Sequence, residues 1–331
     1  MSKIHLVFDH CGAATMQPPR PRVAVSACIL GQPVRYDGGH KRDRFVTDRL
    51  ARELEFVPVC PELEAGLGVP RSPIHLRRRN GEIRLVGSRD HSLDLTGRMR
   101  EVAARRADEF DGRICGLIVQ RNSPSCGMER VAVANEDGTA AGRTGTGMFV
   151  HHFRTRCPLV PIEEAGRLND PVLRENFLER VWCLHRWYRL GADDLAGFIR
   201  FHAAHKLLLM ARGSDAYTGL GRIVSGVTRE TLAERRGRYI RRFMEVLSKR
   251  VSRAQHYNVL QHILGHFRRR LAPADRRELL DLFGSYRSAE VPLAAPLTLL
   301  RHHLRRNPDP WLDQQYYFRP YPDALALRAA V

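Results

Sequence analysis

Three cysteines have the residue type and the setting that metal chemistry requires. Cys28, Cys60 and Cys126 each follow a short apolar run typical of a buried strand, and each stands close to proline or glycine. The carboxyl ends of parallel strands form the ligand crevice of an open sheet, so thiols 32 and 66 residues apart can meet there. Three soft thiolates that leave one coordination position open suit zinc, copper(I) or an iron–sulfur cluster. The alternative is three unrelated buried thiols, each acting as a small hydrophobic residue.

The elements that would position these thiols alternate in type along the first half of the chain. β-Branched runs predict strands, and apolar residues at helical spacing predict helices between them. This alternation indicates an α/β, Rossmann-like domain with a largely parallel sheet. The predicted strands are 23–25, 57–59, 116–119, 131–133 and 159–162, and the predicted helices are 44–54 and 97–110.

The second half carries only helix patterns, and Asn169-Asp170-Pro171 is a typical helix start. The sequence therefore predicts an N-terminal extension (1–21), an α/β domain (22–165), a connecting helix (166–190) and an all-α domain (191–331). The predicted helices of this half are 171–188, 194–212, 228–251, 253–270 and 274–286.

Charge is the third informative feature. The 331 residues include 54 Lys and Arg against 36 Asp and Glu, a net charge of +18, with +7 up to residue 160 and +11 beyond it. A basic two-domain chain favours a polyanionic partner such as nucleic acid, whereas an arginine-rich solvated surface is the simpler alternative. Arg238, Arg242, Lys249 and Arg253 are spaced four, seven and four residues apart, which predicts one basic helical face suited to RNA phosphates.

The seven cysteines are odd in number and widely spread, and no secretory signal or apolar run long enough to span a membrane precedes or separates them. This pattern favours a reducing compartment, and we expect a cytoplasmic protein without a membrane partner. Nothing in the sequence indicates a protein partner.

The sequence motifs around the three cysteines resemble those of a known family. Ser26-Ala27-Cys28-Ile29-Leu30-Gly31, Val59-Cys60-Pro61-Glu62 and Ser123-Pro124-Ser125-Cys126-Gly127 closely resemble the bacterial thiouracil desulfidases over about residues 22–163. Three later motifs resemble the helical domain that is often fused behind that family: Phe201–Met210, His256–His262 and Gln314-Gln315-Tyr316. The fused form is similar to the desulfidases that remove sulfur from 4-thiouridine in tRNA.

The resemblance implies a 4Fe-4S cluster held by Cys28, Cys60 and Cys126, with one iron open to the substrate sulfur. It also implies that Glu62 and Ser123 are catalytic. A carboxylate beside the cluster can handle the protons of the attacking water, and sulfide leaves without net electron transfer. The ordinary alternatives are that Glu62 is a helix-start acid and Ser123 a turn residue; Asp37 and Ser125 are weaker catalytic candidates.

We therefore predict an enzyme, a non-redox desulfidase that converts 4-thiouridine in tRNA to uridine. One alternative is a desulfidase of free thiouracil or thionucleosides. The other is a non-enzymatic module in which the cysteines hold zinc and the helices bind nucleic acid.

Overall fold

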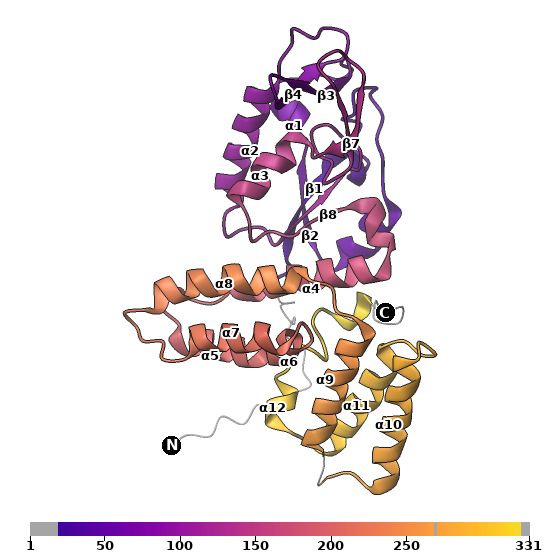
Figure 1. Ribbon diagram of the computed structural model, residues 1–331, viewed down its shortest axis with the longest axis vertical. Coiled ribbons are helices and arrows are strands. Elements are labelled where there is room, and N and C mark those ends of the chain that lie inside the picture. The colour runs from indigo at the N-terminus through magenta and orange to yellow at the C-terminus, as the bar shows by residue number, and fades with distance from the viewer. Residues whose placement is uncertain (1–18, 268–269, 326–331) are drawn as a thin grey trace, which may run out of the picture.

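The computed structural model describes residues 19–267 and 270–325, and the predicted N-terminal extension with Cys11 lies almost wholly outside them. The first part of the chain is an α/β domain, and the second is built of helices (Figure 1). The predicted fold class is thus confirmed. No helix in the described ranges is long and apolar enough to cross a bilayer.

The main sheet contains four parallel strands in the order β2-β1-β5-β8. Central strand β1 is buried along Val23–Val25, which explains its unbroken apolar run. Because β2 lies on one side of β1 and β5 on the other, the chain reverses direction across the sheet between β1 and β5. Such a switch point is where open α/β sheets bind ligands. The strands are β1 (Arg22–Ser26), β2 (Glu55–Val59), β5 (Gly116–Val119) and β8 (Ile162–Glu164).

A second, mixed sheet in the order β4-β3-β6-β7 was only partly expected, since one of its strands alone, 131–133, is among the predicted ones. Strands β3 and β4 form a hairpin that turns at Asn80-Gly81, where both residues have positive φ. An Asn-Gly pair is a strong hairpin signal, but the prediction of strands relied on apolar periodicity and missed it. The strands are β3 (Ile74–Arg79), β4 (Glu82–Gly87), β6 (Val131–Ala134) and β7 (Ala140–Gly145), and the helices of this domain are α1 (Pro61–Glu64), α2 (Thr96–Phe110) and α3 (Met148–Arg156). The predicted helix over 44–54 consists of short turns, Phe45–Arg49 and Leu50–Arg52.

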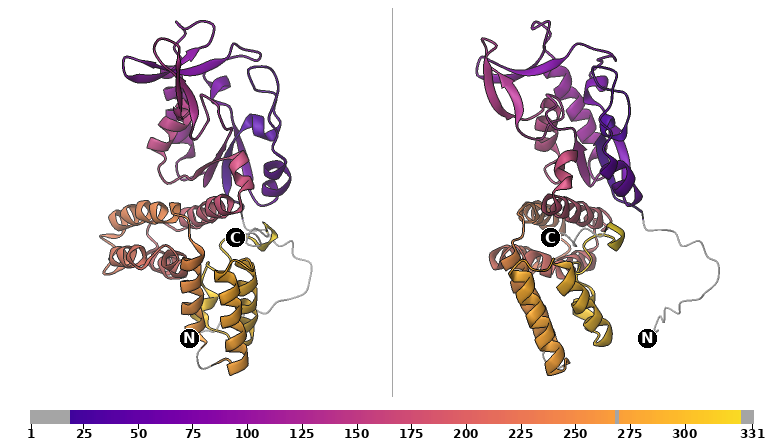
Figure 2. Two further views of the ribbon diagram at one scale, coloured as in Figure 1. Left: turned by 45° about the vertical axis from the view of Figure 1, so that its right-hand side comes forward. Right: turned by 90° about the vertical axis from the view of Figure 1, so that its right-hand side faces the viewer.

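The helical part begins where predicted, at Pro171, because the Asp170 carboxylate accepts the backbone N–H groups of Val172 and Leu173. In Figure 2, both views place the helices at one end of the α/β domain. The helices are α4 (Pro171–Tyr188), α5 (Leu195–Ala204), α6 (Lys206–Met210), α7 (Ser214–Val224), α8 (Leu232–Ser248), α9 (Arg253–His266), α10 (Pro273–Arg287), α11 (Ala294–Arg306) and α12 (Pro310–Asp313).

The predicted single helix over 194–212 is divided at His205. Tyr316 donates its backbone N–H to the Ala204 carbonyl at 3.0 Å, and the Gln315 side chain accepts the Leu207 N–H at 3.2 Å. Residues from the end of the chain thus bond the backbone groups that the break releases.

The predicted basic face on one helix is wrong. Helix α8 ends at Ser248, and Lys249 adopts an extended conformation beyond it. Arg253 begins α9 and donates to the carbonyls of Tyr286 and Val291. Only Arg238 and Arg242 share a helix, because the Ser252 capping box starts a new one after the extended break.

Candidate active site

The three strand-end cysteines line one cavity. Cys28 lies in the turn after β1, Cys60 precedes α1 at the end of β2, and Cys126 lies in the loop after β5. All three contribute to the walls of a cavity of about 420 Å³ at the carboxyl ends of these strands. Among the described residues, no three His, Cys, Asp or Glu side chains lie close enough to share one metal ion. The thiols therefore surround a common space and do not meet at a point.

Burial keeps these thiols protonated when nothing binds them. The pKa of Cys28 is raised to about 11, mainly by burial and also by the nearby Cys60 thiolate, whereas the Arg35 guanidinium acts to lower it. Burial likewise raises the pKa of Cys60, and that of Cys126 well above its ordinary value. The negative charge of Glu62 also raises the pKa of each of the three thiols, so this carboxylate lies near all of them. A metal group bound here must displace the thiol protons.

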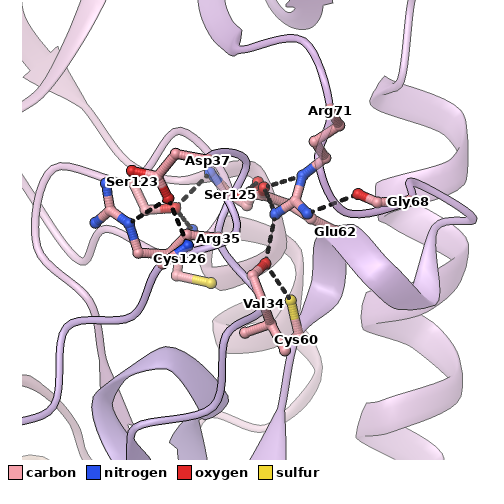
Figure 3. A network of polar contacts seen from close by, with 11 residues as sticks. Val34, Arg35, Asp37, Cys60, Glu62, Gly68, Arg71, Ser123, Ser125 and Cys126 are labelled. Carbon is pink, nitrogen blue, oxygen red and sulfur yellow. Dashed lines mark hydrogen bonds and ion pairs between the residues drawn. The ribbon is translucent and has the colours of Figure 1, made fainter.

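Glu62 is held on both of its oxygens (Figure 3). The Arg71 guanidinium donates to Oε2 from Nε at 2.9 Å and also from Nη2, and the Ser125 hydroxyl donates to Oε1 at 2.9 Å. Arg71 is itself fixed by the carbonyls of Gly68 and Val34, each at 2.9 Å. Its side chain is only 7% exposed. These hydrogen bonds hold the Glu62 carboxylate in one orientation in the wall of the cavity.

Ser123 lines the same cavity and also organises the loop that carries Cys126. Its hydroxyl oxygen accepts the backbone N–H groups of Ser125 at 3.2 Å and Cys126 at 3.0 Å. Two accepted bonds leave its own O–H free to donate toward a bound molecule. The structural and the catalytic interpretations of Ser123 are therefore compatible.

The weaker sequence candidates separate. Neither side chain lines the cavity: Ser125 is fully buried and donates to Glu62, whereas Asp37 accepts the Gly39 N–H within a tight turn. That backbone N–H lowers the pKa of Asp37. Arg71 is not among the predicted site residues, although it follows Pro70 only nine positions after Glu62. Nothing in that local pattern shows that its side chain reaches back to the carboxylate.

A parallel α/β domain with three thiols and an anchored carboxylate around one switch-point cavity defines an enzyme whose site can hold a soft metal group beside an acid–base residue. The chain belongs to the 2-thiouracil desulfurase family, whose model matches residues 23–165, and residues 206–322 match the family described as protein of unknown function (DUF1722). The predicted family, a desulfidase domain followed by a fused C-terminal region, is thus confirmed.

Two curated proteins are similar to this chain. The uncharacterized protein YbgA of Escherichia coli (strain K12) is 32% identical over 157 residues, which are 46% of this chain and 93% of YbgA. The uncharacterized protein YbbK of Bacillus subtilis (strain 168) is 32% identical over 135 residues, 39% of this chain and 85% of YbbK. Among solved structures, the 4Fe-4S-dependent thiouracil desulfidase TudS is 26% identical and covers 47% of this chain and 98% of its own, with a TM-score of 0.38.

Proposed function

We propose that this protein is an iron–sulfur-dependent desulfidase that hydrolyses 4-thiouridine in tRNA to uridine and sulfide. The carrying observation is the single cavity lined by Cys28, Cys60 and Cys126 with Glu62 anchored on its wall. Family membership supports the desulfuration of a thiopyrimidine. The net charge of +18 supports a polyanionic substrate.

The donor set fits a 4Fe-4S cluster. Three thiols from three strand ends surround one space, so a three-cysteine cluster with a free iron can be held by Cys28, Cys60 and Cys126. Arg35, Lys41 and Arg121 also line the cavity and offset the negative charge of bound thiolates. When bound, the cluster supplies a Lewis acid for the thiocarbonyl sulfur.

The protein's own residues handle the proton and the position of the substrate. Water forms the new C4–O bond, the C4–S bond breaks, and sulfur leaves as sulfide, so that nothing is oxidised or reduced overall. Glu62 accepts the proton of the attacking water and returns it to the ring nitrogen or the departing sulfur. Arg71 and Ser125 keep its oxygens aligned, and the Ser123 hydroxyl donates a hydrogen bond to the substrate or the water.

Free thiouracil is the second candidate substrate, because the matching family is described by that base. The two candidates make different demands, since a base in tRNA must leave its stack at a cost of a few kcal/mol. Incubating the anaerobically reconstituted protein with thiolated tRNA, free 4-thiouridine and 2-thiouracil, followed by nucleoside analysis, separates them. We expect uridine to form in tRNA at a much higher kcat/KM than on the free compounds; turnover of the free compounds alone would transfer the proposal to them.

Metal analysis of the same preparations tests the cofactor. We expect about four irons per chain. Replacing Cys28, Cys60 or Cys126 with Ala should abolish iron binding, and Cys157→Ala is the matched control because Cys157 lies outside the cavity lining. A colourless protein containing zinc instead of iron would support the non-enzymatic zinc module.

A further inference from the structure

A second cavity, larger than the cysteine cavity, lies at the junction of the α/β domain and the helices. Its volume is about 1270 Å³, and its walls come from the segment before β1, the turn before β2, helices α4, α5 and α11, and the segment after α12. We call this cavity the arginine groove, because eight arginines line it against only two acids, Glu53 and Asp313. Its lining is therefore strongly cationic.

Three of these arginines have no acidic partner among the described residues. Arg52, Arg189 and Arg305 are exposed, and each comes from a different segment of the chain. Within the described residues, none of the three forms an ion pair. By contrast, Arg301 and Arg319 share Asp323, and Arg200 lies 3.6 Å from Asp194. Three uncompensated guanidinium groups on one groove favour a ligand with several negative charges.

The arginine groove lies too far from the cysteine cavity for one small thiopyrimidine to occupy both. The groove lining includes Pro21 and Glu53, just before β1 and β2, whereas the cysteine cavity includes Cys28 and Cys60, just after them. The two sites thus lie at opposite ends of the parallel sheet. A five-residue strand spans roughly 17 Å, so only an extended molecule can occupy both sites.

We propose that the arginine groove binds the phosphodiester backbone of the RNA substrate at a distance from the base that reacts. The proposal rests on the proposed function, since it assigns where the polyanion is held. Guanidinium groups suit this ligand because their fork of N–H donors matches phosphate oxygens. Phosphate contacts position a nucleic acid without reading its sequence.

The test removes three positive charges from the groove. The triple variant Arg52→Gln, Arg189→Gln, Arg305→Gln is compared with wild type in binding unmodified tRNA transcript over a range of salt concentrations. We expect at least tenfold weaker binding at moderate salt. The slope of log K against log salt concentration should be smaller in magnitude by about two to three, because fewer phosphate contacts release fewer counterions on binding. Thermal unfolding and iron content of the variant report whether it is folded.

The matched control is Arg98→Gln, Arg276→Gln, Arg277→Gln, which changes the charge equally at exposed sites away from the groove. Equal losses in both triple variants would overturn the groove, since the attraction would then be general. Unchanged RNA affinity in a folded groove variant would also overturn it, as would groove-dependent binding to anionic lipid vesicles in place of RNA.

Turnover of thiolated tRNA is scored separately in the same proteins. Wild type that desulfurates tRNA, together with a groove variant that binds RNA normally, overturns the groove and leaves the proposed function intact. Wild type that fails on thiolated tRNA overturns the proposed substrate, while the binding of unmodified RNA still decides the groove.

Discussion

At the scale of residues, the site is organised around the Glu62 carboxylate. The general base that we propose Glu62 to be needs a fixed direction as much as the right charge, because proton transfer requires hydrogen-bond distance to the reacting water. Arg71 and Ser125 supply that direction from opposite oxygens. Arg71 lies outside any strand, and its side chain reaches back to a residue nine positions earlier while the Val34 and Gly68 carbonyls anchor its guanidinium. We therefore regard it as a positioning residue.

A double-mutant cycle tests this role. Glu62→Gln should keep its iron and lose about 10² to 10⁴ in kcat, because positioned proton transfer contributes that much. Arg71→Lys keeps the charge but loses the guanidinium fork, and we expect it to lower kcat about tenfold with KM for the thiolated substrate nearly unchanged. In the Glu62→Gln background the same substitution should have no further effect, because Arg71 acts through the carboxylate. Steady-state kinetics on iron-matched preparations give the answer; equal losses in both backgrounds would mean that Arg71 acts independently.

At the scale of elements, the start of α3 holds the loop that carries Cys126. The N–H groups of Gly147, Met148 and Phe149 donate to the carbonyls of Gly127, Pro124 and Ser125 at 2.7, 2.9 and 3.0 Å. The first amides of a helix have no partner within it, so here they fix the cysteine loop instead. The backbones approach so closely that a Cβ at position 147 would lie 2.5 Å from the Ser125 carbonyl oxygen.

Replacing this glycine should therefore disturb the proposed cluster site through the backbone of Ser125 and Cys126, without removing any of the three thiols. We expect Gly147→Ala to destabilise the fold by about 1–3 kcal/mol and to lower the iron content, because the loop must move away from the helix. Gly97→Ala in α2 is the matched control, since a Cβ there meets open space. Thermal unfolding and iron analysis of both variants check the prediction. An alanine variant at 147 with full iron and unchanged stability would show that the loop can relax.

At the scale of the whole molecule, α4 connects the two parts through packing as well as through the chain. A Cβ at Gly116, in central strand β5, would lie 2.8 Å from Val181 Cγ2 and 3.1 Å from Phe177 Cζ, so α4 lies directly against the start of this strand. The buried apolar residues of both parts form one contiguous cluster. The predicted division at residues 165 and 190 stays a prediction, although the last strand does end at Glu164.

This contact predicts a compensating pair. Gly116→Ala should cost about 1–3 kcal/mol of unfolding free energy through overpacking against α4. Val181→Ala alone should also be destabilising, because it leaves a cavity. Together they should be less destabilising than the sum, since the new methyl group occupies space that valine vacates. Urea titrations of the four proteins measure the coupling; simple additivity would contradict direct packing of α4 on β5.

Much of the architecture could be predicted from the sequence. The apolar runs and helical periodicity gave the central strands and most long helices, because these patterns express which faces an element buries within a few turns. The Asp170-Pro171 start was correct because a cap is a local hydrogen-bonding arrangement. The placement of cysteines at strand ends followed from the same reasoning, and the cavity that they share agrees with it.

The tertiary structure decided what depends on residues far apart in the chain. The division of the helix at His205 is bonded by Gln315 and Tyr316, which no local window contains. The prediction of one basic helical face is wrong because α8 ends at Ser248 and Lys249 is extended, so that Lys249 and Arg253 lie outside this helix. The hydrogen bonds from Arg71 and Ser125 to Glu62, and the arginine groove, form only when separate segments pack together, since burial and charge complementarity are properties of assembled surfaces. Local periodicity thus determined the elements, and long-range packing determined which side chains they bring together.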